Sequence, residues 1–283
     1  MREYPVNRVL VSKEIPQSFA VSPTDTYIDV FSEAERSLII KKYQSPNLFN
    51  GPCVRLDKIV NGVAYVSPVC FFDFLCCNIS GIYNKDMISG VRMEQVLKKY
   101  GKLNTFEKVL QVAELPNIIG TSTLISDPEG NYLLVERNTK VSVGSGTFAC
   151  TSSGSLQIDD LSTKGNFAVA CAERELREEL NISCNLRITG AVIPLQKLQP
   201  IILLSGTVVR PWRDLLPVMK QSQDFVKENT RAVIVPKGNA LQLCAGYQFT
   251  EVASYQILID NNADKVMWNW ASNHLIDIGG FYV

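Results

Sequence analysis

The chain has 283 residues, an apolar fraction of 46%, and 28 basic against 28 acidic side chains. This length is greater than a single hydrophobic core usually supports, so it predicts an enzyme-sized domain with a smaller second domain. Because the net charge is zero without a basic stripe, small molecules are expected partners, and nucleic acid and membrane surfaces are not. The first residues lack a signal-peptide core and no apolar run reaches a bilayer span, so a cytoplasmic protein is expected.

The first predicted unit covers residues 1–113 and has the pattern of a small α+β domain. Two strands are predicted on either side of an Asn61-Gly62 turn, and a short helix over 93–100. A turn-like sequence, ELPN, then marks the expected boundary with a second domain at 114–283.

A hairpin is predicted at the start of the second domain. Residues 120–136 have two apolar runs joined by a turn sequence, DPEG, which is typical of two antiparallel strands. Arg137 follows the second strand. It is either an ordinary surface charge or a group that meets a phosphate or a nucleobase.

The run from Arg174 to Ile182 predicts an amphipathic helix with three carboxylates on one face. Glu175, Glu178 and Glu179 have the spacing i, i+3 and i+4. Apolar residues that can pack on a sheet repeat on the opposite side, at Val169, Ala172, Leu176 and Leu180. Clustered carboxylates repel one another unless a cation lies among them, and Mg²⁺ prefers oxygen ligands completed by phosphates and water. The alternative is a solvated helix stabilised only by the ion pair between Arg174 and Glu178.

The rest of the second domain predicts a mixed sheet between helices. Apolar runs typical of buried strands lie at 185–190, 200–209 and 230–236. A final long helix is predicted over 240–259. Strands that alternate with helices in this way favour an α/β fold with helices on both faces of the sheet.

The helix with the three carboxylates resembles the core of the Nudix box, R-E-U-x-E-E-x-G-U, in which U is aliphatic. Eight of the nine positions conform, and Asn181 stands where the family has Gly. Asn tolerates the left-handed conformation of a helix C-cap, so the change is conservative for the backbone.

The upstream half of the box departs from the family pattern. The family has Gly fourteen residues before the Arg and Glu six residues after that Gly, but this chain has Asp160 and Asn166 there. A loop insertion of about six residues within 159–165 restores the pattern if Gly154 is the box glycine. Asp159 or Asp160 would then replace the missing Glu.

The resemblance implies a Nudix-type sheet and metal-dependent hydrolysis of the pyrophosphate bond in a nucleoside diphosphate linked to another moiety. It implies that Mg²⁺, with Mn²⁺ as the alternative, binds Glu175, Glu178, Glu179 and Asp160. Arg174 would orient these carboxylates. Gly154 would let the loop backbone approach the substrate, and Arg137 would contact it. Glu228 lies in a region where such enzymes supply another metal ligand or a catalytic base.

The N-terminal unit resembles Nudix enzymes similar to UDP-glucose pyrophosphatase. Two sequence patterns carry this looser resemblance, LF-N-G-x-x-x-R-L and F-x-D-F-L-x-x-N, the second covering residues 71–78. It implies a UDP-sugar as the first substrate to test. The alternatives are a catalytically weakened module that binds or senses a nucleotide or nucleotide sugar, and a purely structural role. The sequence leaves open whether the chain forms a homodimer.

The eight cysteines and the single histidine limit the kinds of metal site and catalytic site that the sequence can form. No C-x-x-C is present, and His274 is the only histidine, so neither a zinc pattern nor a histidine-dependent catalytic triad is expected. The cysteines are predicted to be buried free thiols. Any general base must then be a carboxylate, a tyrosine, a lysine or a hydroxide held by a metal.

Overall fold

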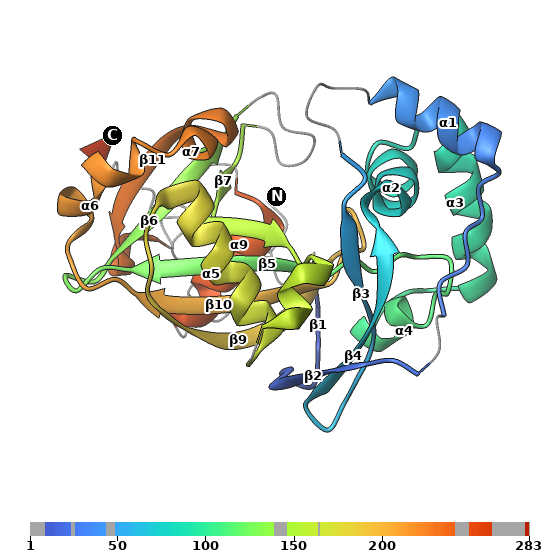
Figure 1. Cartoon of the computed structure of the whole chain (residues 1–283), viewed down its shortest axis with the longest axis horizontal. Helices are drawn as coiled ribbons and strands as arrows, with labels where there is room; N and C mark the ends of the chain where they lie inside the picture. The colour runs from blue at the N-terminus through green and yellow to red at the C-terminus, as the bar shows by residue number, and fades with distance from the viewer. Residues whose placement is uncertain are drawn as a thin grey trace.

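The computed structural model describes residues 9–23, 26–43, 49–138, 146–163, 165–240, 249–261 and 281–282. Within these residues, the strands form one sheet of nine and a second sheet of three. The smaller sheet belongs to an N-terminal unit, which lies to the right in Figure 1, and the larger sheet lies to the left.

The N-terminal unit is a three-stranded sheet with the order β2-β4-β3, covered by helices. Its strands are β2 (Ser18–Val21), β3 (Pro52–Val60) and β4 (Val63–Cys70). Its helices are α1 (Glu33–Lys42), α2 (Phe71–Phe74), the π-helix η2 (Leu75–Tyr83), α3 (Met87–Tyr100) and α4 (Phe106–Leu110). The hairpin predicted around Asn61 and Gly62 is confirmed, because both residues have positive φ angles, 53° and 74°, between β3 and β4.

The helix predicted over 93–100 begins six residues earlier, at Met87. The side chains of Met87 and Val91 are 91% and 56% exposed, so the first turns carry apolar residues that face solvent. An amphipathic pattern therefore marks only the second half of α3.

The larger sheet has the order β1-β9-β10-β5-β6-β11-β12, and β7 and β8 pair with β6 and β5. Its strands are β1 (Val9–Val11), β5 (Gly120–Ser126), β6 (Asn131–Arg137), β7 (Phe148–Ala149), β8 (Ser152–Ser155), β9 (Asn185–Pro194), β10 (Ile201–Thr207), β11 (Asn229–Pro236) and β12 (Phe281–Tyr282). β10 and β5 are parallel, whereas β5 and β6 form the predicted antiparallel hairpin. The sheet is therefore mixed.

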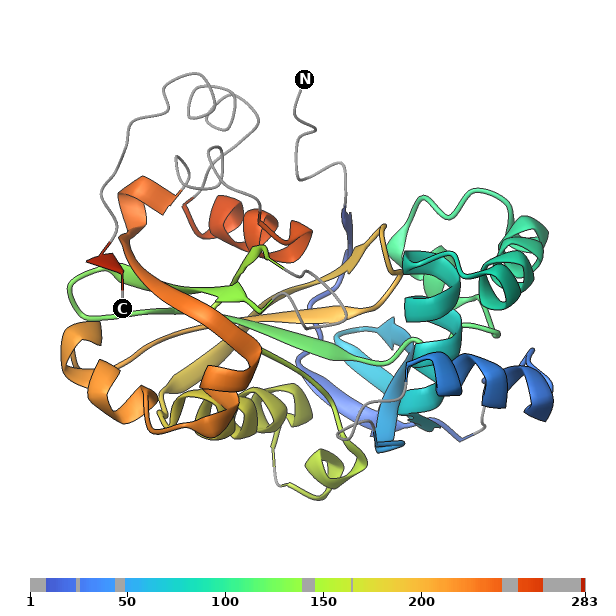
Figure 2. The ribbon, with the colours of Figure 1, turned by 90° about the horizontal axis from the view of Figure 1, so that it is seen from above.

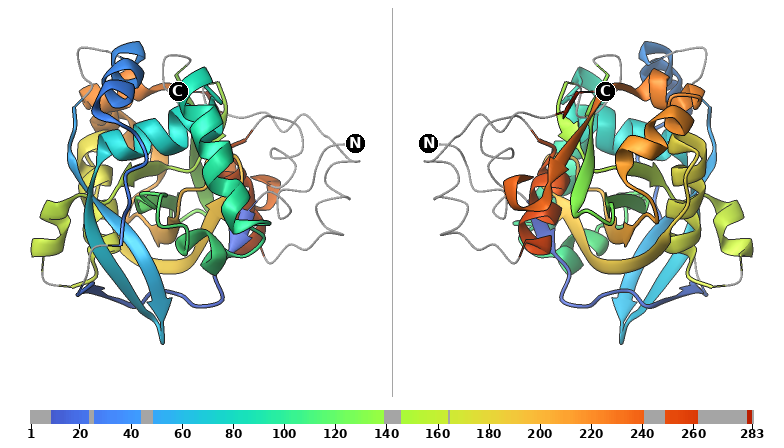
Figure 3. Two further views of the ribbon diagram at one scale, coloured as in Figure 1. Left: turned by 90° about the vertical axis from the view of Figure 1, so that its right-hand side faces the viewer. Right: turned by 90° about the vertical axis from the view of Figure 1, so that its left-hand side faces the viewer.

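Helices cover both faces of the larger sheet. Three of them, α5 (Phe167–Leu180), α6 (Trp212–Met219) and α7 (Gln223–Glu228), lie on one face, and α9 (Glu251–Asp260) lies on the other, as Figures 2 and 3 show. Leu176 and Leu180 of α5 are fully buried against the first face, and Ile257 of α9 against the second. The predicted fold class is confirmed: an α/β mixed sheet between helices, with a smaller N-terminal α+β unit.

The final helix differs from its prediction over 240–259. α9 begins only at Glu251, because the side chain of Thr250 accepts a hydrogen bond from the amide of Ala253 and caps the helix. Phe249 is still extended and bridges to Phe148. Residues 241–248, together with Cys244 and His274, lie outside the described part of the chain. The short helices α6 and α7 were not predicted, since neither repeats long enough to show a helical period.

The two units share a core. Val54 and Leu56 of β3 belong to the same buried cluster as Ala168 of α5 and Ile202 of β10. In addition, β1 crosses from the N-terminal part of the chain into the larger sheet and pairs antiparallel with β9. The boundary between 1–113 and 114–283 stays a prediction. Among the described residues, no helix combines the length and the apolar character that crossing a membrane requires.

Candidate functional site

Helix α5 carries the predicted carboxylates and is capped at both ends by asparagine. Asn166 is the N-cap, and its Oδ1 accepts hydrogen bonds from the amides of Ala168, at 3.0 Å, and Val169, at 3.4 Å. Asn181 is the C-cap, with φ 56° and ψ 35°. The left-handed conformation predicted for Asn181 is therefore confirmed, and Asn166 starts the helix.

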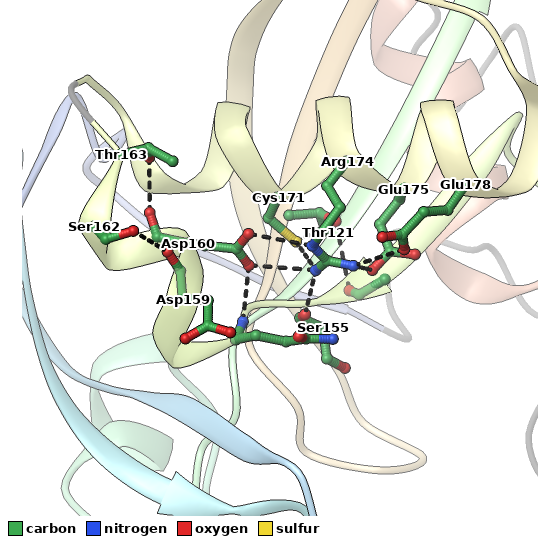
Figure 4. Close-up of polar contacts among 12 residues, drawn as sticks. Thr121, Ser155, Asp159, Asp160, Ser162, Thr163, Cys171, Arg174, Glu175 and Glu178 are labelled. Atoms are coloured by element: carbon green, nitrogen blue, oxygen red, sulfur yellow. Dashed lines mark hydrogen bonds and ion pairs between the residues drawn. The ribbon is translucent and has the colours of Figure 1, made fainter. Parts of the chain in front are cut away.

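Arg174 is the centre of the site, and Figure 4 shows its guanidinium between carboxylates from the helix and from the preceding loop. Its Nη1 donates to Glu175 Oε1 at 2.7 Å and to Glu178 Oε2 at 3.1 Å. Its Nε and Nη2 face the two oxygens of Asp160, at 3.2 and 3.3 Å. Nη2 also donates to the carbonyl of Ser155 at 3.3 Å. One side chain thus ties the helix to the loop.

The carboxylates around Arg174 raise the pKa of its guanidinium. Burial lowers the pKa of Arg174, but the hydrogen bonds that Arg174 donates to Asp160 and the charge of Glu175 outweigh this effect, and the pKa rises above its usual range. Among the described residues, the carboxylates of Asp160, Glu175 and Glu178 face the guanidinium of Arg174. Nearby, burial raises the pKa of the Cys171 thiol, with Glu175 and Asp160 adding to the shift, and keeps that thiol neutral.

Gly154 lies directly against the side chain of Glu175. A Cβ built at Gly154 would stand 2.1 Å from both Cδ and Oε1 of Glu175. The strand β8 holds Gly154 there, because Gly154 pairs with Thr121 of β5, whose Oγ1 donates to the Gly154 carbonyl at 3.4 Å. The space that this glycine leaves is therefore filled by the carboxylate.

Asp160 is the loop acid that meets the helix, whereas Asp159 is exposed. Asp160 is 5% exposed, and its Oδ2 also accepts a hydrogen bond from the amide of Gln157 at 2.9 Å. It follows Gly154 by six residues, the spacing that the box has between its Gly and its Glu. Asp160 lies in the short 3₁₀ helix η3 (Ile158–Ser162), which precedes α5.

The remaining predicted site residues lie around this cluster. The Glu178 side chain is 53% exposed, and the Glu179 residue is 7% exposed. At the end of β6, Arg137 Nη1 donates to Ser153 Oγ at 3.5 Å, one residue before Gly154. Arg137 also pairs in register with Asn229, which follows Glu228 in the chain. The side chain of Glu228 is not among those described, so its predicted role stays a prediction.

The donor set agrees with a hard divalent cation. Carboxylate oxygens of Glu175 and Glu178 already converge on one positive group, Arg174 Nη1, and oxygen donors of this kind are the ligands that Mg²⁺ prefers. Among the described residues, no three acidic, histidine or cysteine side chains converge closely enough to hold a metal by themselves. Mg²⁺ commonly uses one or two carboxylates and completes its shell with water and substrate phosphates.

One contributor to this site had no signal in the sequence. The carbonyl of Ser155 accepts a hydrogen bond from Arg174, but a backbone group is present at every residue and marks no residue type. The Gly154 to Asp160 spacing could have identified this acid, because it equals the expected spacing between Gly and Glu in the box.

Several solved structures are similar to part of this chain. A Nudix hydrolase from Alicyclobacillus acidocaldarius has 10% identity over 54% of this chain and 95% of its own, with a TM-score of 0.40. A MutT protein from Methanosarcina mazei Go1 has 16% identity over 51% and 92%, with a TM-score of 0.36. A Nudix hydrolase from Nitrosomonas europaea has 17% identity over 51% and 88%, with a TM-score of 0.37. No family model matches the sequence, and no curated protein matches it.

Proposed function

We propose that this chain is a Nudix-like hydrolase that cuts the pyrophosphate bond of a nucleoside diphosphate linked to another moiety. One observation carries the proposal: Arg174 gathers Glu175, Glu178 and Asp160, and Glu175 packs on the backbone of Gly154. These five residues occupy the Arg, Glu and Gly positions of the box, with Asp160 in place of its upstream Glu. A helix that is only solvated would not require a glycine, Gly154, in contact with Glu175. It would also not require a buried carboxylate, Asp160, paired with Arg174.

The residues of the cluster have separable roles in this proposal. Glu175, Glu178 and Glu179 would hold Mg²⁺, or Mn²⁺ as the alternative. When bound, the ion neutralises phosphate charge and lowers the pKa of the attacking water. Arg174 keeps the carboxylates of Glu175 and Glu178 within reach of one another before the cation arrives. Asp160 acts as a positioning residue, because its oxygens are directed at Arg174 and at the Gln157 amide.

A UDP-sugar is the first substrate that we propose to test. The motivation is the N-terminal pattern over residues 71–78, which resembles that of UDP-glucose pyrophosphatase-like enzymes. The rival is a module that binds a nucleotide or nucleotide sugar without cutting it. The insertion after Asp160 favours the rival, because it changes the entry to the helix that carries the acids.

The first experiment separates these two functions. The purified protein is incubated with UDP-glucose, ADP-ribose and related nucleoside diphosphate compounds, with and without Mg²⁺, and the products are separated by chromatography. The hydrolase releases a nucleoside monophosphate only when Mg²⁺ is present. The binding module releases none but raises its melting temperature with a ligand, because ligands that prefer the folded state stabilise it.

Variants of the helix test the metal role. We expect Glu178→Gln and Glu179→Gln each to lower kcat by about 100-fold, because each removes a charge that holds the cation. Glu173→Gln is the matched control, since Glu173 lies on the same helix but about 200° around its axis from Glu175. Near-normal turnover in both site variants would remove the metal role from this helix.

A further inference from the structure

Two buried side chains of the larger sheet, Thr123 of β5 and Ser152 of β8, form a hydroxyl pair without hydrogen bonds. Thr123 is fully buried, and Ser152 is 1% exposed. Among the described residues, neither Thr123 Oγ1 nor Ser152 Oγ has a hydrogen-bond partner. A hydroxyl that loses water without gaining a partner destabilises a protein, so a bound group that completes both hydroxyls is expected here.

The strand register places the hydroxyl pair on the face of the sheet that carries α5. Thr123 and Ser152 are direct partners in the pairing of β5 with β8, and the neighbouring pair is Thr121 with Gly154. Thr121 Oγ1 lies 3.6 Å from a thiol of α5 (Figure 4), and a Cβ at Gly154 would meet Glu175 of the same helix. Side chains two residues apart on a strand share a face, so the hydroxyl pair also points toward α5.

The adjacent serines of the same two strands point to the opposite face and have partners there. Ser122 Oγ donates to Gln256 Oε1 of α9 at 3.0 Å, and Ser153 Oγ accepts from Arg137 Nη1 at 3.5 Å. The protein therefore supplies hydrogen bonds to the serine hydroxyls on the α9 face and leaves the hydroxyl pair on the α5 face without them.

The acidic turns of α5 lie over the hydroxyl pair. On this face of β5, Thr121 contacts the first half of α5, and Ile125 belongs to the same buried cluster as Leu180 at the end of the helix. Helix and strand therefore run in the same direction. One helical turn rises about 5.4 Å and two strand residues about 7 Å, so successive pairs of the strands lie opposite successive turns. Because Glu175 covers the neighbouring pair, the next turn, which carries Glu179, lies across from the hydroxyl pair.

We propose that Thr123 and Ser152 belong to the proposed cation site and supply neutral oxygen atoms to a bound Mg²⁺ and its water shell from the sheet side. This inference rests on the proposed function and deepens it, because it extends the site from α5 to the strands beneath it. Mg²⁺ prefers oxygen ligands and keeps several waters. Groups that hydrogen-bond to its waters and carboxylates orient them and raise the metal affinity, so both hydroxyls are positioning groups.

Cation binding without substrate is the first test of the hydroxyl pair. The dissociation constant of Mn²⁺ on the full chain is read from the electron paramagnetic resonance signal of the free ion, and that of Mg²⁺ from competition. We expect Ser152→Ala and Thr123→Val each to raise both constants about 10-fold. Without a cation, each variant should melt at or above the wild-type temperature, because an unpaired buried hydroxyl is removed. Unchanged dissociation constants in both variants would overturn the inference.

Ser122→Ala is the matched control, because it removes a hydroxyl of β5 that has a protein partner. It should lower the melting temperature of the cation-free protein and leave the dissociation constants unchanged. If Ser152→Ala lowered the cation-free melting temperature as much as Ser122→Ala does, Ser152 would have a partner within the protein, and the inference would be overturned.

A conservative variant separates the hydroxyl of Thr123 from its shape. Thr123→Ser keeps the hydroxyl and should bind Mn²⁺ within about threefold of the wild type, whereas Thr123→Val keeps the shape and should not. The reverse order would assign a packing role to Thr123 and overturn the inference for it. In turnover of UDP-glucose, Ser152→Ala should raise the Mg²⁺ concentration for half-maximal rate about 10-fold and keep kcat at saturating Mg²⁺ within about threefold.

The outcomes for the two proposals are distinguishable. If the wild type binds the cation and hydrolyses a substrate while Ser152→Ala and Thr123→Val bind the cation normally, the inference fails and the proposed function stands. If the wild type binds the cation without turnover, hydrolysis fails, and the dissociation constants of the variants still decide the inference. If the wild type binds neither cation, with or without UDP-glucose, the metal role and the inference fall together.

Discussion

Gly154 and Glu175 show how one residue without a side chain builds the candidate site. The carboxylate of Glu175 fills the space where a Cβ of residue 154 would be, so helix α5 and strand β8 are in close contact at this point. Arg174 then joins Glu175 of α5 to Asp160 of η3. The close packing of Gly154 and Glu175 therefore sets the positions of the charged groups, and the ion pairs of Arg174 form within that arrangement.

Gly154→Ala is therefore expected to lower kcat at least about 10-fold, because the new methyl group must displace the Glu175 carboxylate. It should also destabilise the fold by about 1–3 kcal/mol, measured by urea unfolding. The matched control is Gly190→Ala, where the new Cβ would meet only Leu203 Cδ1, at an ordinary 3.7 Å. Equal activity and stability in the two variants would contradict the packing argument.

At the scale of the element, α5 depends on its two ends. Asn166 caps the start of the helix, and Asn181 ends it in a left-handed conformation. The amide of Ile182 donates to the carbonyl of Leu176, which closes the last turn. Because the acidic residues occupy the last two turns, the C-cap fixes the backbone conformation of the turn that carries Glu178 and Glu179.

The effect of a substitution at Asn181 on the free energy of unfolding should depend on how readily the new residue adopts the left-handed conformation, and not on its polarity. Asn181→Gly is expected to leave the free energy of unfolding unchanged within about 0.5 kcal/mol, since Gly adopts the left-handed region freely. Asn181→Val should lower it by about 1–2 kcal/mol, because a β-branched residue is strained there. Urea unfolding followed by circular dichroism measures both, and a valine variant as stable as the glycine variant would contradict this reading of the C-cap.

At the scale of the whole molecule, the two units are joined too closely to unfold separately. β1 lies in the larger sheet, one buried cluster contains residues of both units, and Asn78 holds the β9 to β10 connection. We expect a single cooperative transition in urea, with coincident curves from tryptophan fluorescence and far-ultraviolet circular dichroism. Two separated transitions would show that the units are independent.

The buried thiols predict how the stability of the whole molecule depends on pH. Among the described residues the cysteines are free, and burial raises the pKa of Cys53 and Cys76 to about 11 and of Cys150 to about 12. Unfolded cysteine titrates near pH 8.5, so above that pH the unfolded chain binds fewer protons than the folded one. Their contribution to stability is therefore complete below about pH 8.5 and is lost as the pH rises toward 11–12.

We expect the free energy of unfolding, measured in urea with a reducing agent, to fall by at least about 1 kcal/mol between pH 8 and pH 10. Lys197 acts in the opposite direction over this range, because its folded pKa is lowered, but it is one group against several thiols. Cys150→Ala should show a shallower fall than the wild type. A free energy that stays constant to pH 10 would contradict the burial of these thiols.

The sequence by itself determined the features that depend on neighbouring residues. The helical period and the order of acids predicted α5, the Asn61-Gly62 pair predicted one hairpin, and Asn181 predicted the left-handed end of the helix. These features need only the local conformational preferences of a few adjacent residues. The mixed sheet followed from the alternation of such elements along the chain.

Tertiary structure alone decided which distant residues meet. Asp160 meets Arg174, which is 14 residues away in the sequence, and Phe249, just before the cap of α9, bridges to Phe148. Asn78 and Lys197 are 119 residues apart, and no local pattern records their hydrogen bond. Such contacts form only when the two sheets pack, because their free energy comes from the shared core rather than from the residues beside them in the chain.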